Sequence, residues 1–240
     1  MSGECSRTST PYRWVERPLY KDTDNPGAPP EGYNSLFPWD TELTQEYRLN
    51  GIRAGKLYPY VEDVTLYHCP ADKNLNSPLP TYAAYRSYSI PGLMNSEDFT
   101  QRTGWPGYVP PYGWRTVALP DGGSMRLKLA EKRQDIVSPA RKYVFVEEDG
   151  ASANQPYNLG GFVLMLQGYW SWTDWPAPYH GNQSVLGFAD GHVDVQRWTD
   201  LRTICIMKRQ PLPGTTVLPS MIQPDNPDLD YMRRGYLACE

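Results

Sequence analysis

The sequence predicts an α+β fold with a small antiparallel sheet, short helices and long loops rich in proline and glycine. Two features of the composition support this prediction: 24 of the 240 residues are proline, and 18 tyrosines with 8 tryptophans help to bring the aromatic content to 13%. Proline interrupts helices, whereas tyrosine and tryptophan favour strands. A third feature is local, since residues 142–147 and 161–167 are short apolar runs of strand length.

We expect one globular unit over residues 1–240, because the length suffices for one sizeable core and no composition shift marks a boundary. Three parts of this unit are expected to be irregular. They are an N-terminal segment at 1–38, a long loop insertion at 95–123 and a Pro-rich tail at 210–240 that wraps the surface.

The first half of the chain predicts short elements. Asp40 can cap a helix that ends at Gly51, and a second, very short helix is expected before Pro59. Strands are expected at 65–69 and 85–90, each followed directly by a proline.

Residues 184–198 carry the strongest local signal. Asp190 and Gly191 stand between two strand-like runs, and we expect a tight hairpin turn in which both residues have positive φ. Val193 and Val195 then alternate with polar residues, so we expect the two valines to face the core.

Charge excludes one class of partner. The net charge is −4, with 23 basic against 27 acidic residues and no lysine or arginine run. Nucleic-acid binding needs a concentrated basic face, so we expect no nucleic-acid partner. No window approaches the roughly 20 apolar residues of a membrane helix.

One candidate metal site combines His180, His192 and Asp194. His and Asp at alternating positions of a strand project from the same face and, with a nearby histidine, can ligate a divalent ion. The alternative, which we favour, is structural: Asp190 makes the turn, and His180 orients its loop through a hydrogen bond.

A second candidate follows the apolar run at 142–147. Glu147, Glu148 and Asp149 are adjacent carboxylates that can bind calcium through oxygen ligands. We favour a solvated turn for them. The sequence therefore predicts no resident cofactor, with calcium as the one candidate.

Motifs of covalent catalysis are missing. Cys69 follows His68, but neighbours on a strand point to opposite faces, so His68 is badly placed to activate the thiol. We expect Cys69 to be a disulfide partner or a core thiol. The four cysteines are Cys5, Cys69, Cys205 and Cys239; they form no C-x-x-C pair and can be paired in three ways.

An aromatic cluster contains Trp170, Trp172 and Trp175. These side chains can form a stacking platform for a glycan, or they can anchor proline-rich loops by packing. We favour packing, because Pro176 and Pro178 lie next to the cluster.

Several segments also form an ordered set. His180 is followed after nine residues by Asp190 and Gly191, and the earlier segments are KLYPYV at 56–61, YHCPAD at 67–72, RSYSI at 86–90 and SPARKYVFVE at 138–147. In this order and spacing they resemble the prepilin-like, type II secretion pseudopilin-like proteins of planctomycete, verrucomicrobial and lentisphaeral bacteria. The resemblance spans about residues 40–205.

This resemblance implies a pilin-like head, a non-catalytic structural subunit of a type II secretion pseudopilus or of a type IV pilus-like surface filament. Its partners would be like subunits and secretion-system proteins, at the periplasmic side or the cell surface. The family carries an N-terminal prepilin signal and a long apolar helix, which this sequence does not show; membrane attachment is expected only through such a helix.

Within the resemblance, His180, Asp190 and Gly191 are expected to form a structural motif that fixes the C-terminal hairpin. Two other functions stay open on the residues alone. One is an extracellular glycan-binding module that uses the tryptophan cluster, and the other is a metal-dependent hydrolase built on His180, His192 and Asp194.

Overall fold

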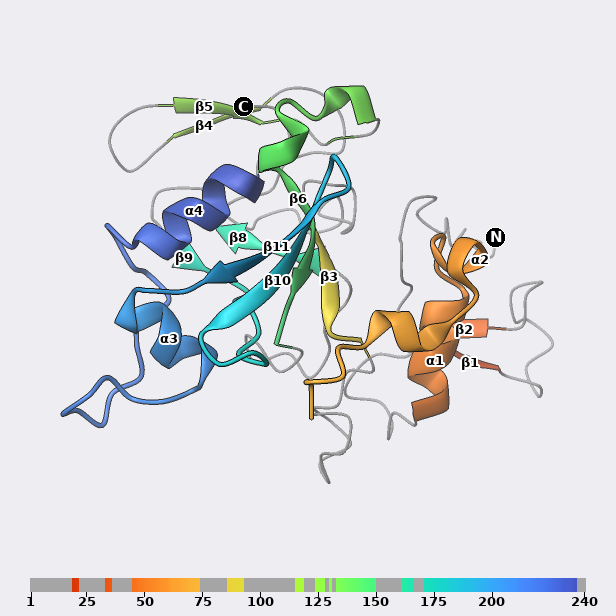
Figure 1. Ribbon diagram of the computed structural model, residues 1–240, viewed down its shortest axis with the longest axis horizontal. Helices are drawn as coiled ribbons and strands as arrows, with labels where there is room; N and C mark the ends of the chain where they lie inside the picture. The colour runs from red at the N-terminus through yellow and green to blue at the C-terminus, as the bar shows by residue number, and fades with distance from the viewer. Residues whose placement is uncertain are drawn as a thin grey trace, which may run out of the picture.

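The computed structural model describes residues 19–21, 33–35, 45–73, 86–92, 115–118, 124–127, 130, 133–149, 161–165 and 171–236. Its centre is a five-stranded sheet with the order β11-β10-β6-β3-β7 (Figure 1). The strands are β3 (Tyr88–Pro91), β6 (Tyr143–Glu147), β7 (Gly161–Phe162), β10 (Gln183–Phe188) and β11 (Val193–Arg197). The α+β class is confirmed, but the sheet is mixed and not purely antiparallel, because β7 pairs with β3 in parallel.

Three two-stranded sheets and short helices complete the described structure. The small sheets are β1 (Leu19–Lys21) with β2 (Tyr33–Ser35), β4 (Arg115–Ala118) with β5 (Ser124–Leu127), and β8 (Leu164–Met165) with β9 (Ser171–Trp172). The α-helices are α1 (Gln45–Arg53), α2 (Tyr58–Val61), α3 (Leu201–Met207) and α4 (Pro227–Tyr236), and the 3-10 helices are η1 (Val64–Tyr67), η5 (Arg133–Asp135) and η6 (Pro139–Arg141). Among the described residues, no helix combines the length and the apolar character needed to cross a membrane.

The central sheet is packed on both faces, with α3 and α4 on one side and α1 and α2 on the other (Figure 1). The larger core joins buried side chains of β6, β7, β10, α3 and α4. The smaller core lies on the opposite face and joins α1, α2 and η1 to β3 and β6. Its members are Ile52, Tyr67, Leu57, Tyr58, Val61, Val64, Tyr88, Ile90 and Phe145.

A bulge in β6 places Tyr143 on the same face of the sheet as Val146. Gly187 of β10 pairs with Phe145, but the next residue, Phe188, pairs with Tyr143, so Val144 is the extra residue. Tyr143 belongs to the larger core, whereas Phe145 packs in the smaller one.

The predicted strand at 65–69 is wrong. Residues Val64–Tyr67 form the 3-10 helix η1, and the Asp63 side chain caps it by accepting a hydrogen bond from Thr65 N at 2.8 Å. This local side-chain bond favours a helical turn over an extended strand. The other early elements are shifted: α1 runs through Gly51 to Arg53, and Pro59 lies in the first turn of α2 instead of ending it.

The hairpin of β10 and β11 is confirmed, but its predicted turn is wrong. Phe188 N donates to His192 O at 2.8 Å, and Gly191 N donates to Phe188 O at 3.0 Å. The loop therefore has three residues, of which Gly191 has a φ of +100° while Asp190 has no positive φ. A tight turn followed by a left-handed glycine is the usual three-residue connection.

The expectation that Val193 and Val195 face the core is also wrong. Their exposed fractions are 67% and 52%. They pair with Gly187 and Val185 on the sheet face that α1 and α2 cover only near β3 and β6. The alternation of apolar and polar residues assigned the side chains of β11 to two faces. It did not show which face is covered by other elements, and β11 lies at the edge of the sheet.

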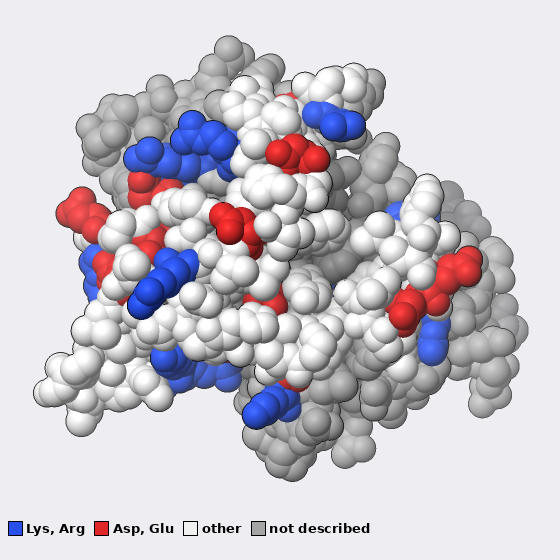
Figure 2. Space-filling view, in the orientation of Figure 1, with Lys and Arg blue, Asp and Glu red and all other residues white. Residues whose placement is uncertain are grey.

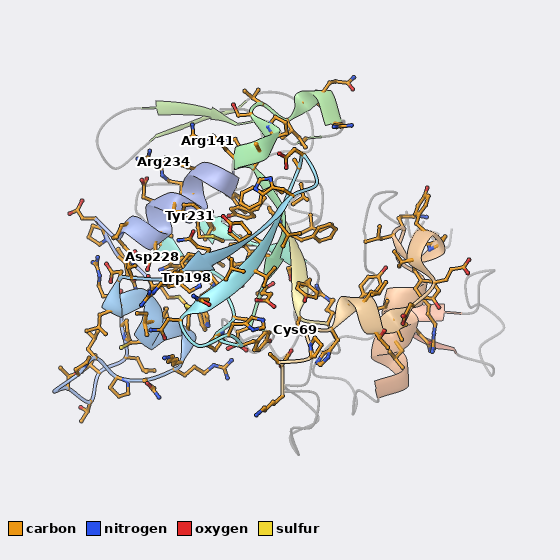
Figure 3. All side chains as sticks on the ribbon, viewed as in Figure 1. Cys69, Arg141, Trp198, Asp228, Tyr231 and Arg234 are labelled. Carbon is orange, nitrogen blue, oxygen red and sulfur yellow. The ribbon has the colours of Figure 1, made fainter. Side chains whose placement is uncertain are left out.

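The tail at 210–240 does more than wrap the surface, because it contains α4. Asn226 Oδ1 accepts hydrogen bonds from Asp228 N and Leu229 N, and Pro227 begins the helix. An Asn cap followed by proline is a helix-start signal that sequence reasoning missed. Tyr231 packs edge-to-face against Trp198, with ring centroids 6.4 Å apart (Figure 3).

Two other expected irregular segments are only partly described. The described parts of 1–38 are the strands β1 and β2. In 95–123 the described residues are 115–118, which form β4. The remaining residues of both segments lie outside the described part of the chain.

Candidate functional site

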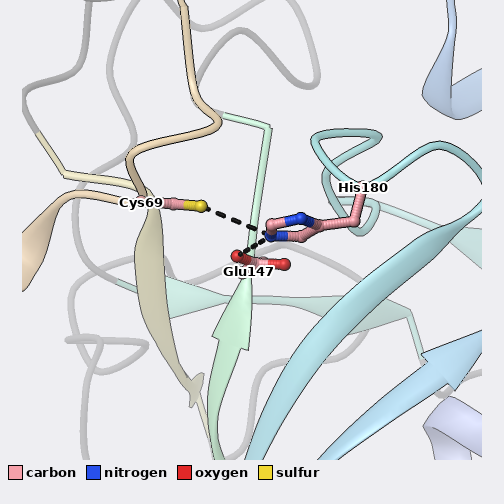
Figure 4. Close-up of side chains that lie close together, drawn as sticks. All are labelled: Cys69, Glu147 and His180. Atoms are coloured by element: carbon pink, nitrogen blue, oxygen red, sulfur yellow. Dashed lines mark hydrogen bonds and ion pairs between the residues drawn. The ribbon is translucent and has the colours of Figure 1, made fainter.

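Three side chains from distant parts of the sequence meet at one end of the central sheet. Cys69 Sγ lies 3.4 Å from His180 Nε2, and the same nitrogen lies 3.1 Å from Glu147 Oε1 (Figure 4). All three ligand-type atoms lie within 4.8 Å of one another, and within the described residues this is the one group of three or more His, Cys, Asp or Glu side chains with that property.

Cys69 lies just after η1, where a hydrogen bond to Ser87 fixes its backbone. Its backbone N–H donates to Ser87 Oγ at 3.0 Å, and Ser87 Oγ donates in turn to Asp72 Oδ2 at 2.7 Å. Cys69 is 3% exposed and is a free thiol. Its burial as a free thiol is what the core-thiol alternative expects, while Cys5 and Cys239 lie outside the described residues.

Glu147 is the last residue of β6 and is completely buried. Val185 N donates to its Oε2 at 2.7 Å, which leaves Oε1 directed at His180. Ala177 N donates to the Glu147 carbonyl at 2.9 Å and so ties the loop before β10 to the end of β6.

His180 reaches the cluster from this loop. Tyr179 Oη donates to Glu148 O at 3.2 Å, and Gly181 adopts a φ of +79°, so the chain turns directly after the histidine. The His180 side chain is 37% exposed, in contrast to the two buried partners. The favoured prediction that His180 orients its loop by a hydrogen bond agrees with this contact to Glu147.

Cys69 and Glu147 both contact the same imidazole nitrogen of His180, Nε2. Burial raises the pKa of the Cys69 thiol, with the Glu147 carboxyl acting in the same direction, so the sulfur is a protonated thiol at neutral pH.

The predicted metal set of His180, His192 and Asp194 is not assembled. Among the described residues, the one group that could hold a metal ion joins His180 to Cys69 and Glu147 and includes neither His192 nor Asp194. His192 Nδ1 instead lies 2.6 Å from Asp190 Oδ1, and its ring stacks on Phe188 at 4.3 Å. Asp194 accepts a hydrogen bond from Val195 N at 2.7 Å.

The predicted solvated turn at Glu147, Glu148 and Asp149 is wrong. Their exposed fractions are 0%, 2% and 4%. Glu148 N donates to Ser87 O, and Asp149 forms an ion pair with Arg209, so neighbouring segments cover this end of β6. Glu147 contacts His180 and Asp149 contacts Arg209, so these two carboxylates have different partners.

The tryptophans at 172 and 175 do not present a stacking face. Trp172 is 1% exposed and Trp175 is 7% exposed. The Trp172 indole N–H donates to Gln223 Oε1 at 3.1 Å, inside the larger core. Their burial agrees with the packing alternative; Trp170 lies outside the described residues.

Cys205 is the other cysteine among the described residues, and it is not part of the cluster. Cys205 is a free, buried thiol of α3. Cys5 and Cys239 lie outside the described residues.

On the surface, basic and acidic side chains of the described residues are interspersed over the face shown in Figure 2. Around α4, for example, Asp230 pairs with both Arg233 and Arg234. The described residues of this face therefore mix both signs of charge.

Sequence reasoning named Cys69, Glu147 and His180 separately but did not bring them together. A usable signal existed, since the three residues lie in three of the segments that carry the family resemblance, at 67–72, 138–147 and 180–191. Ser87, which holds Cys69 in place, lies in a fourth segment at 86–90.

Comparisons of the chain with protein-family models, with curated proteins and with solved structures find no match.

Proposed function

We propose that this protein is the head of a pilin-like structural subunit, non-catalytic, which assembles with like subunits in a type II secretion pseudopilus or a type IV pilus-like surface filament. The observation that carries the proposal is the meeting of the resemblance segments at one place. Cys69, Ser87, Glu147 and His180 come from four such segments and are joined by direct contacts.

Each part of the His-x9-Asp-Gly motif has a structural task that suits a building block. His180 ties the loop before β10 to the end of β6. Asp190 accepts a hydrogen bond from His192 N at 3.1 Å, and Gly191 supplies the left-handed residue of the hairpin loop. The motif thus fixes both ends of β10, the strand that joins the edge strand to the centre of the sheet.

The exposed valines of the edge strand add support. Val193 and Val195 present apolar surface beside a strand edge. Such edges are suited to contacts between subunits, whereas isolated soluble proteins usually protect them.

The first experiment is to sequence the DNA directly upstream of the Met1 codon. The proposal expects an in-frame prepilin signal followed by a long apolar helix. An in-frame stop codon with a ribosome-binding site before Met1 would overturn the assembly role.

A second experiment locates the protein in the source cells. Antibodies against the 240-residue chain are used on the envelope fraction, on the material released by mechanical shearing, and on the cytoplasmic fraction. The proposal expects signal in the envelope or sheared material, and a signal confined to the cytoplasm would contradict it.

A further inference from the structure

We propose that Cys69, Glu147 and His180 form a zinc-binding site that ties the segment after η1 to the central sheet. The site rests on these three side chains alone and does not depend on filament assembly. Its starting point is the convergence of one sulfur, one carboxylate oxygen and one imidazole nitrogen within 4.8 Å (Figure 4).

Two of the three separations between the donor atoms match those of one tetrahedral ion, and the third, from Cys69 Sγ to Glu147 Oε1, is within 4.8 Å. With zinc bonds of about 2.3 Å to sulfur and about 2.05 Å to nitrogen or oxygen, tetrahedral angles place S and N about 3.5 Å apart and N and O about 3.3 Å apart. The corresponding separations are 3.4 Å for Cys69 Sγ to His180 Nε2 and 3.1 Å for His180 Nε2 to Glu147 Oε1. A small outward movement of each side chain is enough to admit the ion.

The three groups contact one another, since the Cys69 thiol also hydrogen-bonds to the Glu147 carboxyl, and no single nitrogen-bound proton serves both contacts of His180 Nε2. If His180 Nε2 carries a proton, that proton is directed at one of its two neighbours and not at both. If Nε2 is unprotonated, it accepts from the Cys69 thiol, and it then faces the ionised Glu147 as a second acceptor at 3.1 Å. A cation at this point is attracted by all three atoms.

The surroundings orient the ligands as a metal site requires. Ser87 Oγ accepts a hydrogen bond from the Cys69 backbone N–H, and Val185 N donates one to Glu147 Oε2. Glu147 Oε1 is therefore the carboxylate oxygen directed at the proposed zinc ion. Such supporting contacts fix ligand direction. Glu147 is fully buried and its cost of burial falls when a cation neutralises it.

The set of ligands selects the metal class. Thiolate, imidazole and carboxylate together suit zinc, whereas calcium takes oxygen ligands only. His180 is 37% exposed, so water can reach the fourth coordination position. Binding replaces the Cys69 thiol proton, which is released to solvent as the Zn–S bond forms.

The test uses the full chain, purified, stripped with a chelator and dialysed against zinc, with bound metal measured by elemental analysis. We expect one equivalent of zinc and a rise in melting temperature, because zinc binds the folded state. Cobalt serves as a second probe, since a Co–thiolate bond produces a charge-transfer absorption that reports sulfur ligation.

His180→Gln is the decisive variant, because glutamine keeps a side chain that can hydrogen-bond to Glu147 but lacks the imidazole ligand. We expect its zinc affinity to fall by ~10-fold or more, and Cys69→Ser to lose the cobalt–thiolate absorption. His192→Gln and Cys205→Ser are matched controls and should bind zinc as the parent does.

Two outcomes overturn the site. One is the absence of stoichiometric zinc in the parent chain. The other is unchanged zinc binding in both His180→Gln and Cys69→Ser, which would place the metal elsewhere. Circular dichroism of each variant separates loss of binding from loss of folding.

Discussion

Gly235 of α4 lies directly against the ring of Tyr143 in β6. A Cβ atom at residue 235 would stand 2.6 Å from Tyr143 Cδ1 and Cε1. The ring cannot move aside freely, because Tyr143 Oη donates to Met232 O at 2.8 Å and the ring packs edge-to-face against Phe162. A glycine at this position is therefore what allows α4 to approach the sheet.

We accordingly predict that Gly235→Ala destabilises the protein by about 2 kcal/mol, as overpacking of a filled core commonly does. Urea unfolding followed by tryptophan fluorescence measures the loss. Gly187→Ala is the control, since its Cβ would meet Phe145 at 3.5 Å, an ordinary contact. Equal stability of the two variants would contradict the close approach of α4 to Tyr143.

A substitution at Gly191 in the hairpin loop changes backbone strain without introducing a steric clash. Gly191 has a φ of +100°, and a Cβ there would meet nothing within 4 Å. We predict that Gly191→Ala lowers the free energy of unfolding by about 1–2 kcal/mol through backbone strain alone. Gly191→Asn should lose less, because Asn tolerates left-handed backbone better than Ala does. A melting temperature of Gly191→Ala equal to that of the parent would count against the three-residue loop.

Asp228 anchors the start of α4 to the end of β11 (Figure 3). Its carboxylate accepts from Thr199 N at 3.0 Å and from Asp200 N at 2.9 Å, and the residue is 3% exposed. Asp228→Ala leaves these two N–H groups without that acceptor, and we expect a loss of about 1–3 kcal/mol in thermal or urea unfolding.

Asp230→Ala is the matched control for Asp228→Ala. Asp230 lies on the same helix, and its ion pairs with Arg233 and Arg234 are partly exposed. Such pairs contribute up to about 1 kcal/mol. If the two alanine variants lost the same stability, the anchoring role of Asp228 would be wrong.

Asp200 gives a prediction of pH dependence. The Arg202 guanidinium, which lies 2.7 Å from Asp200 Oδ2, holds the pKa of the Asp200 carboxyl below its usual value. A carboxyl with a lowered pKa stabilises the fold above its unfolded-state pKa, and this contribution is lost as the pH falls through the folded-state pKa.

Asp200→Asn removes the charge but keeps a side chain that caps α3 well. We expect this variant to be about 0.5–1 kcal/mol less stable than the parent at pH 7, with the gap closing as the pH is lowered toward 3, below the carboxyl's unfolded-state pKa of roughly 3.9. Urea unfolding of both proteins across that range checks it. A gap that stays constant with pH would mean that charge pairing does not stabilise this helix start.

Local sequence patterns predicted several elements well. The apolar run ending at Glu147 became β6, and Asp190-Gly191 marked the turn between β10 and β11. The strand β6 and this turn both depend on residues that are close in sequence, the strand on its run of apolar side chains and the turn on its Asp-Gly pair. The same kind of signal was present at Asn226-Pro227 and was overlooked, so α4 counts among the predictable elements.

Such local patterns did not predict which faces of the strands are covered by other parts of the chain. Alternation divided β11 into two faces, yet it could not show that Val193 and Val195 lie on the part of a sheet face that α1 and α2 do not reach. For the acidic run after β6, polarity suggested solvent, whereas packing of distant segments buried it. Burial depends on what lies opposite, which neighbouring residues do not encode.

The sequence by itself thus determined the α+β class, the hairpin and the chemical types available for a site. Only the tertiary structure decided which of them meet. Cys69 and His180 are 111 residues apart, and Glu147 is 33 residues from His180. They come together because β3 pairs with β6 and β6 with β10, and these pairings bring distant segments to the same end of the central sheet. Burial of the strand faces in the core determines which strands pair and in which register. Cys69, Glu147 and His180 therefore meet only in the folded chain.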